Sequence, residues 1–230
     1  MTMMANGSEK TGFMAEIKKD WLAVSLILAS LITGVLVYPH LPDLVPSHWN
    51  VQGQVDSYSS KIWGAFGLPL MAAGIYLLMV LVPRIDPRRE NYARFRGAYR
   101  FLKLALAVFL VLLYVIILMN AMGYRVSVDR AVVTAVGLLF MVLGNFMGQL
   151  RHNYFVGIKT PWTLASEEAW QKTHRFAARL WVGAGLVTAL SGLLLGGQKG
   201  LVIIVAALGT AAIVPVIYSY LLFKNQTRSP

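Results

Sequence analysis

Apolar residues fill six long stretches of this chain, and short polar segments separate them. Each stretch approaches the roughly 20 helical residues that a hydrocarbon core about 30 Å thick requires. The pattern predicts six membrane-spanning helices, at residues 21–38, 62–82, 102–122, 131–150, 180–197 and 201–223. The first stretch is short and follows two lysines, as a signal peptide would, but no small-residue cleavage site comes after it. We therefore expect this helix to be retained.

The composition supports a membrane protein and excludes several other classes. Of the 230 residues, 57% are hydrophobic and 13% are charged, compared with about 25% charged in soluble domains. The absence of Cys excludes a disulfide scaffold, a thiolate zinc site, an iron–sulfur cluster and a cysteine nucleophile. The centres of the apolar stretches carry no ionisable residue, which argues against an ion-coupled carrier. Lys103 lies near one end of its stretch and is expected to snorkel to the interface.

The basic residues predict the orientation of the helices. Of the 21 Lys and Arg residues, 17 fall in the N-terminal tail, the second and fourth connections and the C-terminus. Lys and Arg gather on the cytoplasmic side of membrane proteins, so both termini are expected inside a bacterial cytoplasmic membrane. The net charge of +11 is then explained by topology and by contact with the lipid bilayer, and no direct binding of nucleic acid is expected.

The expected fold is an all-α integral membrane protein: a bundle of six transmembrane helices, with a cytoplasmic amphipathic helix between the fourth and fifth. Residues 1–20 are expected to form a cytoplasmic tail, disordered over residues 1–12. Residues 21–83 hold the first two helices and a folded extracytoplasmic loop at 39–61. Residues 84–230 form a four-helix module with cytoplasmic loops at 84–101 and 151–179.

The outer loop is too long and too polar to be a simple connection. Its prolines restrict the chain and Gly53 permits a turn. Imidazole and carboxylate groups both suit zinc, so the loop offers candidate metal ligands, although their spacing matches no compact metal motif. These candidates are His40, Asp43, His48 and Asp56. The preferred interpretation is a folded loop without a metal or other cofactor, with Trp49 and Tyr58 at the membrane interface.

The second polar block runs from the end of the fourth stretch to the start of the fifth. A helix is expected to begin near Thr163 or Ser166, either of which can cap it. Glu168 and Lys172 are spaced to pair on its surface. An aromatic stripe suggests that this helix lies on the inner leaflet, and its members are Trp170, His174, Ala177 and Trp181.

Individual residues of this inner block have a structural and a chemical interpretation. His174 is expected to be hydrogen-bonded rather than catalytic, and Glu167 to start a helix rather than act as a base. Asn145, Arg151 and Asn153 are expected to tie the helix end to the loop. Removing the Asn145 amide should then leave a buried partner unsatisfied, at roughly 1–3 kcal/mol. Binding of a partner protein is the alternative role for this block.

Small residues recur four apart in two of the apolar stretches. Gly144 and Gly148 form one such pair, and Gly192 and Gly196 form the other. This spacing allows helix backbones to approach closely. Packing within the bundle is favoured over dimerisation.

Both polar blocks resemble known segments. The outer loop resembles a small domain of uncharacterised function that often precedes SdpI-type modules, through Leu41, Pro42, Pro46, His48, Trp49, Asn50, Gly53, Asp56 and Lys61. The inner block resembles the signature of the SdpI immunity-protein family. The residues of this inner match include Asn145, Gly148, Arg151, Asn153, Tyr154, Thr160, Pro161, Trp162, Glu167, Trp170 and His174.

The resemblance implies a function at the membrane. It implies a protein that protects a bacterium from a secreted antimicrobial peptide toxin and that, with toxin present, holds a winged-helix transcriptional repressor at the membrane. The outer loop would then contact the toxin through Asp43, His48, Trp49, Asn50, Asp56 and Lys61. The inner block would brace the bundle or bind the repressor, and no catalytic residue is assigned. A metal-dependent enzyme at the outer surface and a small-molecule or lipid transporter remain the alternatives.

Overall fold

Six long helices dominate the structure, a computed structural model that describes residues 13–195 and 197–226. All six are long and apolar enough to cross a membrane, which confirms the predicted all-α membrane bundle. The expected disordered tail at residues 1–12 lies outside the described residues. The six helices are α2 (Trp21–Val37), α3 (Lys61–Ile85), α4 (Arg96–Ala121), α5 (Val128–Met147), α7 (Glu167–Leu194) and α8 (Gly197–Gln226).

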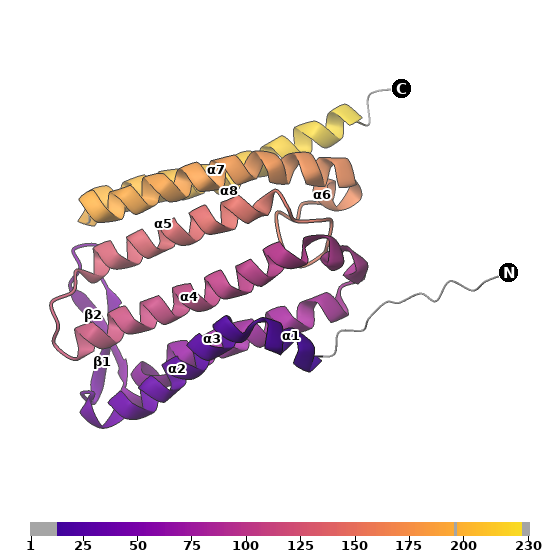
Figure 1. Ribbon diagram of the computed structural model, residues 1–230. Coiled ribbons are helices and arrows are strands. Elements are labelled where there is room, and N and C mark those ends of the chain that lie inside the picture. The colour runs from indigo at the N-terminus through magenta and orange to yellow at the C-terminus, as the bar shows by residue number, and fades with distance from the viewer. Residues whose placement is uncertain (1–12, 196, 227–230) are drawn as a thin grey trace.

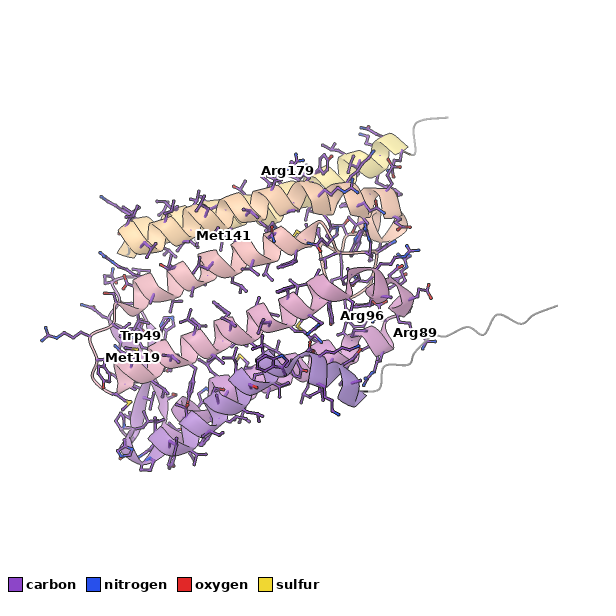
Figure 2. All side chains as sticks on the ribbon, in the orientation of Figure 1. Trp49, Arg89, Arg96, Met119, Met141 and Arg179 are labelled. Atoms are coloured by element: carbon purple, nitrogen blue, oxygen red, sulfur yellow. The ribbon has the colours of Figure 1, made fainter. Side chains whose placement is uncertain are left out.

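Shorter elements lie at the two ends of the bundle, as Figure 1 shows. One end carries the hairpin of β1 (Leu44–Trp49) and β2 (Val55–Ser60), preceded by the short η1 (Tyr38–His40). The opposite end carries α1 (Phe13–Lys19), η2 (Arg89–Phe95) and α6 (Pro161–Ala165). Helices that follow one another in the sequence pack side by side, in the order α2, α3, α4, α5, α7 and α8. In Figure 2, Arg89 and Arg96 lie at the end with α1, and Trp49 lies at the end with the hairpin.

Glycines bring α5 and α7 together backbone to backbone. A Cβ atom on Gly185 would lie 2.5 Å from the Met141 nitrogen and 2.6 Å from the Gly137 oxygen. A Cβ atom on Gly144 would lie 2.7 Å from the Val182 nitrogen. No side chain fits at these distances, so the glycines form a seam along which the two helices run antiparallel. Packing within the bundle is confirmed for Gly144.

The same seam continues at the hairpin end and weakens at the other end. A Cβ atom on Gly192 would lie 2.7 Å from the Thr134 nitrogen, so Gly192 also packs inside the bundle as predicted. At Gly148 a Cβ atom would make only ordinary contacts, the nearest at 3.8 Å. Gly196 lies outside the described residues. The tightly packed glycines are therefore seven apart on each helix, and the predicted spacing of four identified only one member of each pair.

Buried side chains join α2, α3 and α4, and Gly34 also brings α2 close to the α3 backbone, where a Cβ atom would lie 2.7 Å from the Ala65 oxygen. Their buried cluster consists of Ala23, Ile27, Ala72, Tyr76, Val80, Ala107 and Leu110. Between membrane helices such a cluster acts through van der Waals packing, because lipid tails are as apolar as the side chains.

One part of the predicted fold is wrong. The amphipathic segment between the fourth and fifth helices is not a separate helix on the inner leaflet, because α7 runs without a break from Glu167 to Leu194. Trp170, His174 and Ala177 are completely buried. The aromatic stripe therefore faces protein rather than lipid, and only the five-residue α6 precedes it. The expected tail at residues 1–20 also contains a helix, α1.

Candidate functional site

The inner loop, residues 148–160, is folded around the side chain of Asn153, which is completely buried. Its Nδ2 donates to the carbonyls of Arg151 and Val156, at 2.8 and 2.9 Å. Its Oδ1 accepts from the backbone N–H groups of Phe155 and Val156, at 2.9 and 2.7 Å. One amide thus satisfies four backbone groups of an irregular segment, which must find partners when they are buried.

Asp86 connects this loop to the end of α3. Its carboxylate is buried and accepts from the backbone N–H groups of Arg88 and Tyr154, at 2.7 and 3.0 Å, and from the Tyr92 hydroxyl at 2.9 Å. The Asn91 side chain donates to the His152 carbonyl at 2.7 Å. The connections after α3 and after α5 are therefore joined into one polar network, which the sequence did not predict.

Trp170 and His174, on α7, pack against the inner loop. Their rings stack with centroids 4.1 Å apart, and the Trp170 indole donates to the Leu150 carbonyl at 3.0 Å. The backbone N–H of Ile158 donates to His174 Nε2 at 2.9 Å, so Nδ1 carries the proton and donates to the Trp170 carbonyl at 2.8 Å. Both nitrogens of His174 are occupied, as its structural interpretation requires. Gly157, with a φ of 116°, leaves room for these two rings.

The end of the inner loop and α6 contact α8 through a hydrogen bond and through packed rings. Thr160 caps α6 by accepting from the Thr163 backbone N–H at 3.1 Å, and its hydroxyl lies 3.1 Å from that of Ser219. Pro161 occupies the first turn of α6, and the Trp162 ring packs edge-on against Tyr220. Ser166 caps α7, which confirms one of the two predicted caps.

Other residues of the inner block lie toward the surface. Asn145 is exposed on α5. The prediction that its amide makes a buried contact is therefore wrong. Arg151 is half-buried, and Gly148 ends α5.

The tip of the inner loop and the first turn of α7 are also exposed. Tyr154 is exposed beneath the Arg88 guanidinium. Glu167, in the first turn of α7, accepts from the Gln171 side chain at 3.3 Å. The predicted pair of Glu168 and Lys172 is confirmed at 2.5 Å.

The pKa of His152, in the inner loop, is lowered by its surroundings. Burial lowers the pKa of the imidazole below its ordinary value of 6.5, and the nearby Arg88 guanidinium lowers it further. The unfolded chain therefore binds a proton more readily than the folded loop does. The contribution of His152 to stability is present above its unfolded-state pKa and decreases as the pH falls through that value.

Replacing Asn153 by Ala should destabilise the protein far more than replacing Asn145 by Ala. Asn153→Ala leaves buried backbone groups without partners, at roughly 1–3 kcal/mol for each group that water cannot reach. Asn145→Ala removes an exposed amide and should leave the melting temperature nearly unchanged. Thermal unfolding of both variants in the same detergent measures the difference. Equal melting temperatures would contradict the structural role assigned to Asn153.

The outer loop is a β-hairpin whose turn is organised by Asn50. The Asn50 side-chain oxygen accepts from the backbone N–H groups of Gln52 and Gln54, both at 3.0 Å. Gly53 donates to the Asn50 carbonyl at 2.9 Å and has a φ of 76°, which favours glycine. The folded loop at 39–61 was expected, but its two strands were not.

The hairpin is anchored on the ends of α3 and α4. Val45 is completely buried and packs where a side chain on Gly64 would otherwise lie. It belongs to a cluster with Leu41, Tyr114 and Leu118. At the other extremity, the Gly53 turn lies against the Asp129 side chain at the start of α5. The hairpin therefore extends from one half of the bundle to the other.

The candidate residues of the outer loop are spread over this hairpin. His48 Nδ1 and Asp56 Oδ1 lie 2.5 Å apart, and both side chains are exposed. His40 and Asp43 are exposed, and Trp49 is half-buried. Lys61 begins α3, with its ammonium 5.1 Å from the centre of the Tyr38 ring. Within the part of the chain that the structure describes, no three His, Asp or Glu side chains form a group that could hold a metal ion.

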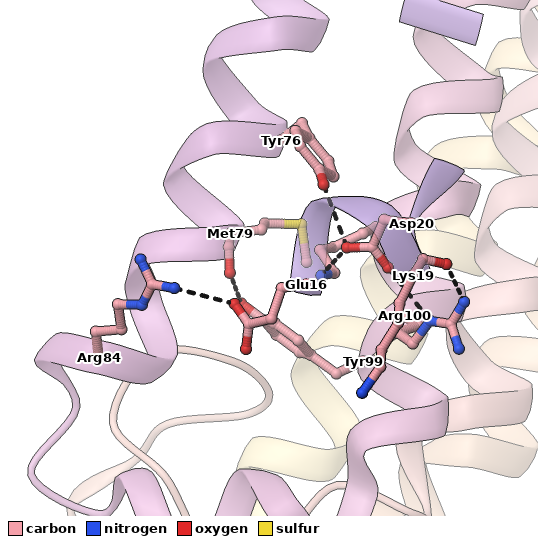
Figure 3. Close-up of polar contacts among 9 residues, drawn as sticks. Glu16, Lys19, Asp20, Tyr76, Met79, Arg84, Tyr99 and Arg100 are labelled. Atoms are coloured by element: carbon pink, nitrogen blue, oxygen red, sulfur yellow. Dashed lines mark hydrogen bonds and ion pairs between the residues drawn. The ribbon is translucent and has the colours of Figure 1, made fainter. Parts of the chain in front are cut away.

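A buried ionic cluster at the α1 end was missed by the sequence analysis. Lys103 is buried, rather than snorkelling as predicted, and its ammonium pairs with the buried carboxylate of Asp20. The Arg100 Nε pairs with the same carboxylate at 3.3 Å, and the Tyr76 hydroxyl donates to it at 3.3 Å. Figure 3 shows Asp20 between Tyr76 and Arg100. An acidic residue directly before Trp21 and a lysine three residues after Arg100 were the available signals.

Comparisons with known proteins match both polar blocks. Residues 149–219 match the SdpI/YfhL protein family, and residues 25–73 match a domain of unknown function, DUF1648. A curated relative, the "Immunity protein SdpI" of Bacillus subtilis (strain 168), is 28% identical over 211 residues, which cover 90% of this chain and 97% of the relative. No solved structure was found to match the chain. The predicted resemblance is thus confirmed: in this multi-pass membrane protein, a segment that matches DUF1648 precedes one that matches the SdpI/YfhL family.

Proposed function

We propose that this protein is a membrane immunity protein that protects its host from a secreted antimicrobial peptide toxin. The relative from Bacillus subtilis is named an immunity protein and aligns with nearly the whole chain, which supports this role. In this proposal the protein acts by binding rather than by catalysis. The hydrogen-bonded state of His174 agrees with that view, since neither nitrogen is available as a base.

The proposed orientation places the hairpin outside the cell and both termini in the cytoplasm. The support is the excess of Lys and Arg at the α1 end of the bundle. Ser57, in the hairpin, and Lys159, in the inner loop, are both exposed, so cysteines there can report on sidedness. An impermeant maleimide should label Ser57→Cys on whole cells and Lys159→Cys only after lysis. The reverse pattern would overturn this orientation, and the cysteine-free parent chain is the control.

The observation that carries the proposal is the surface of the hairpin. Its base is anchored by Val45, yet Leu44 and Tyr58 remain 63% and 56% exposed on the same hairpin as the exposed pair of His48 and Asp56. An anchored hairpin that exposes large apolar side chains together with a carboxylate and an imidazole fits an amphipathic peptide, because exposed apolar patches mark interaction sites. We assign toxin contact to Asp43, His48, Trp49, Asn50, Asp56 and Lys61.

On the cytoplasmic side we assign binding of a winged-helix repressor to the tip of the inner loop. Tyr154 and Phe155 are 41% and 40% exposed there, whereas Trp170 and His174 are buried. The buried pair supports the loop from within and cannot touch a partner directly. Aromatic residues are enriched in protein interfaces, which favours the tip as the contact surface.

Two single variants separate the proposed faces. Trp49→Ala should abolish toxin protection in a sensitive host, because a half-buried indole supplies apolar area and one N–H donor. Phe155→Ala should retain protection and lose retention of the repressor at the membrane. The survival of toxin-treated cells and the membrane fraction of a tagged repressor are the two measurements.

The matched control is Trp63→Ala, which removes an exposed indole at the same end of the molecule but outside the hairpin. It should protect like the parent protein when expressed at the same level. Full protection by Trp49→Ala would place toxin recognition elsewhere. Loss of protection in Trp63→Ala would mean that any interfacial indole matters, rather than the hairpin.

A further inference from the structure

A pocket opens between the start of α2 and the first turns of α4, beside the ionic cluster. Its volume is about 190 Å³. Two of its walls differ in chemistry: Lys19, Asp20 and Arg100 form the polar side, and Trp21, Leu22, Phe101 and Leu104 form the apolar side. Neither toxin contact nor repressor binding, as proposed above, uses this pocket.

The polar side carries more positive than negative charge. The Asp20 carboxylate is shared by the Arg100 guanidinium and the Lys103 ammonium, so one negative charge faces two positive charges. Lys19 adds another positive charge on the exposed side. Arg100 keeps 47% of its side chain exposed, whereas Lys103 is enclosed. The Arg100 Nη2 also donates to the Lys19 carbonyl, so an anion at the pocket would meet the exposed remainder of the guanidinium and the Lys19 ammonium.

The apolar side faces outward, toward the surroundings of the bundle. Trp21 and Phe101 are 62% and 55% exposed, and they belong to two neighbouring membrane helices. In a bilayer such surfaces contact acyl chains. An ion such as free phosphate would use the cationic side alone and would leave the apolar wall without a partner.

We propose that this pocket is a binding site for an anionic phospholipid. The phosphate lies against Arg100 and Lys19, and an acyl chain runs along Trp21 and Phe101. Guanidinium and ammonium groups bind phosphate through charge-assisted hydrogen bonds, and the exposed rings of Trp21 and Phe101 offer an acyl chain a surface to pack against. The bound lipid would tie the junction of α1 and α2 to α4.

Gly97 provides a variant that fills the pocket without touching its charges. It lines the pocket, and a Cβ atom built on it meets nothing within 4 Å. Gly97→Leu should therefore fold and occupy the space of the acyl chain. Gly74 on α3 is equally open but lies away from the pocket, so Gly74→Leu is the matched control. Lys19→Gln tests the cationic side.

The experiment is binding of phosphatidylglycerol to the full chain in detergent, measured by native mass spectrometry and by the rise in melting temperature. Phosphatidylcholine and inorganic phosphate are the comparison ligands. The parent protein and Gly74→Leu should prefer phosphatidylglycerol to either. Gly97→Leu should lose that preference, and Lys19→Gln should weaken it about five-fold, as expected for one interfacial charge.

Three results would overturn the proposal. If inorganic phosphate raises the melting temperature as much as phosphatidylglycerol does, the site binds an anion and no lipid. If phosphatidylcholine binds equally well, the cationic side has no role. If Gly97→Leu binds phosphatidylglycerol like Gly74→Leu, the lipid lies elsewhere on the protein.

Discussion

Replacing Gly185 by Leu is expected to destabilise the protein by about 3 kcal/mol or more. The Cβ atom alone would lie 2.5 Å from the Met141 nitrogen, and a backbone atom cannot move aside as a side chain can. The helices α5 and α7 would have to separate along their whole seam. The expected result is a large drop in melting temperature in detergent, or a chain that does not accumulate in the membrane.

The matched control lies two residues away on the same helix. A Cβ atom placed on Gly183 would meet no other atom within 4 Å, so Gly183→Leu introduces the same side chain into open space. It should match or exceed the parent protein in stability, because Leu favours a helix over Gly by somewhat less than about 1 kcal/mol. Similar losses in both variants would show that the glycine seam does not hold α5 to α7.

The second large effect is expected from Asp20→Asn. This change leaves the enclosed Lys103 ammonium without its carboxylate, and breaking a buried ion pair in this way costs about 3–5 kcal/mol. Combining Asp20→Asn with Lys103→Met removes both charges and should recover much of that loss. Thermal unfolding of the two single variants and the double variant forms a double-mutant cycle.

An exposed pair gives the comparison for this cycle. Glu168 and Lys172 are more than half exposed at a distance of 2.5 Å, and Glu168→Gln should change the melting temperature little. If Asp20→Asn is as mild as Glu168→Gln, the cluster at the α1 end contributes no more than a surface pair. A double variant no better than Asp20→Asn would mean that the enclosed charge is not the cause of the loss.

The six membrane helices could be predicted because apolar length reports directly on the hydrocarbon thickness. The helix boundary at the α1 end of the bundle could not be predicted in the same way. The predicted fifth helix began at residue 180, whereas α7 begins at Glu167, because its first turns bury an aromatic stripe against the inner loop instead of lipid. Hydropathy measures contact with lipid, and it does not register a polar helix segment that packs under a loop.

The parts of the candidate sites that escaped prediction depend on distant partners. Asp20 and Lys103 are 83 residues apart, and each alone resembles an ordinary residue at the end of a membrane helix. Asn153 was identified in its loop, but the contact of that loop with Asp86, which follows α3, was not. The strands of the hairpin were missed because most of their side chains are exposed, so the apolar alternation typical of a half-buried strand is weak.

The glycine seam also decides which motions the bundle permits. Where two backbones touch, no side chain can change rotamer to accommodate a shift, so α5 and α7 move as one body. Between α4 and α5 the contact runs instead through side chains, such as Phe101 stacked on Phe146 with ring centres 5.1 Å apart. Stacked rings can slide past one another, and sliding of packed helices is the shear type of conformational change. A plane along which the helices can slide therefore lies between α4 and α5, and the hairpin crosses that plane, from Val45 against α4 to the Gly53 turn against α5.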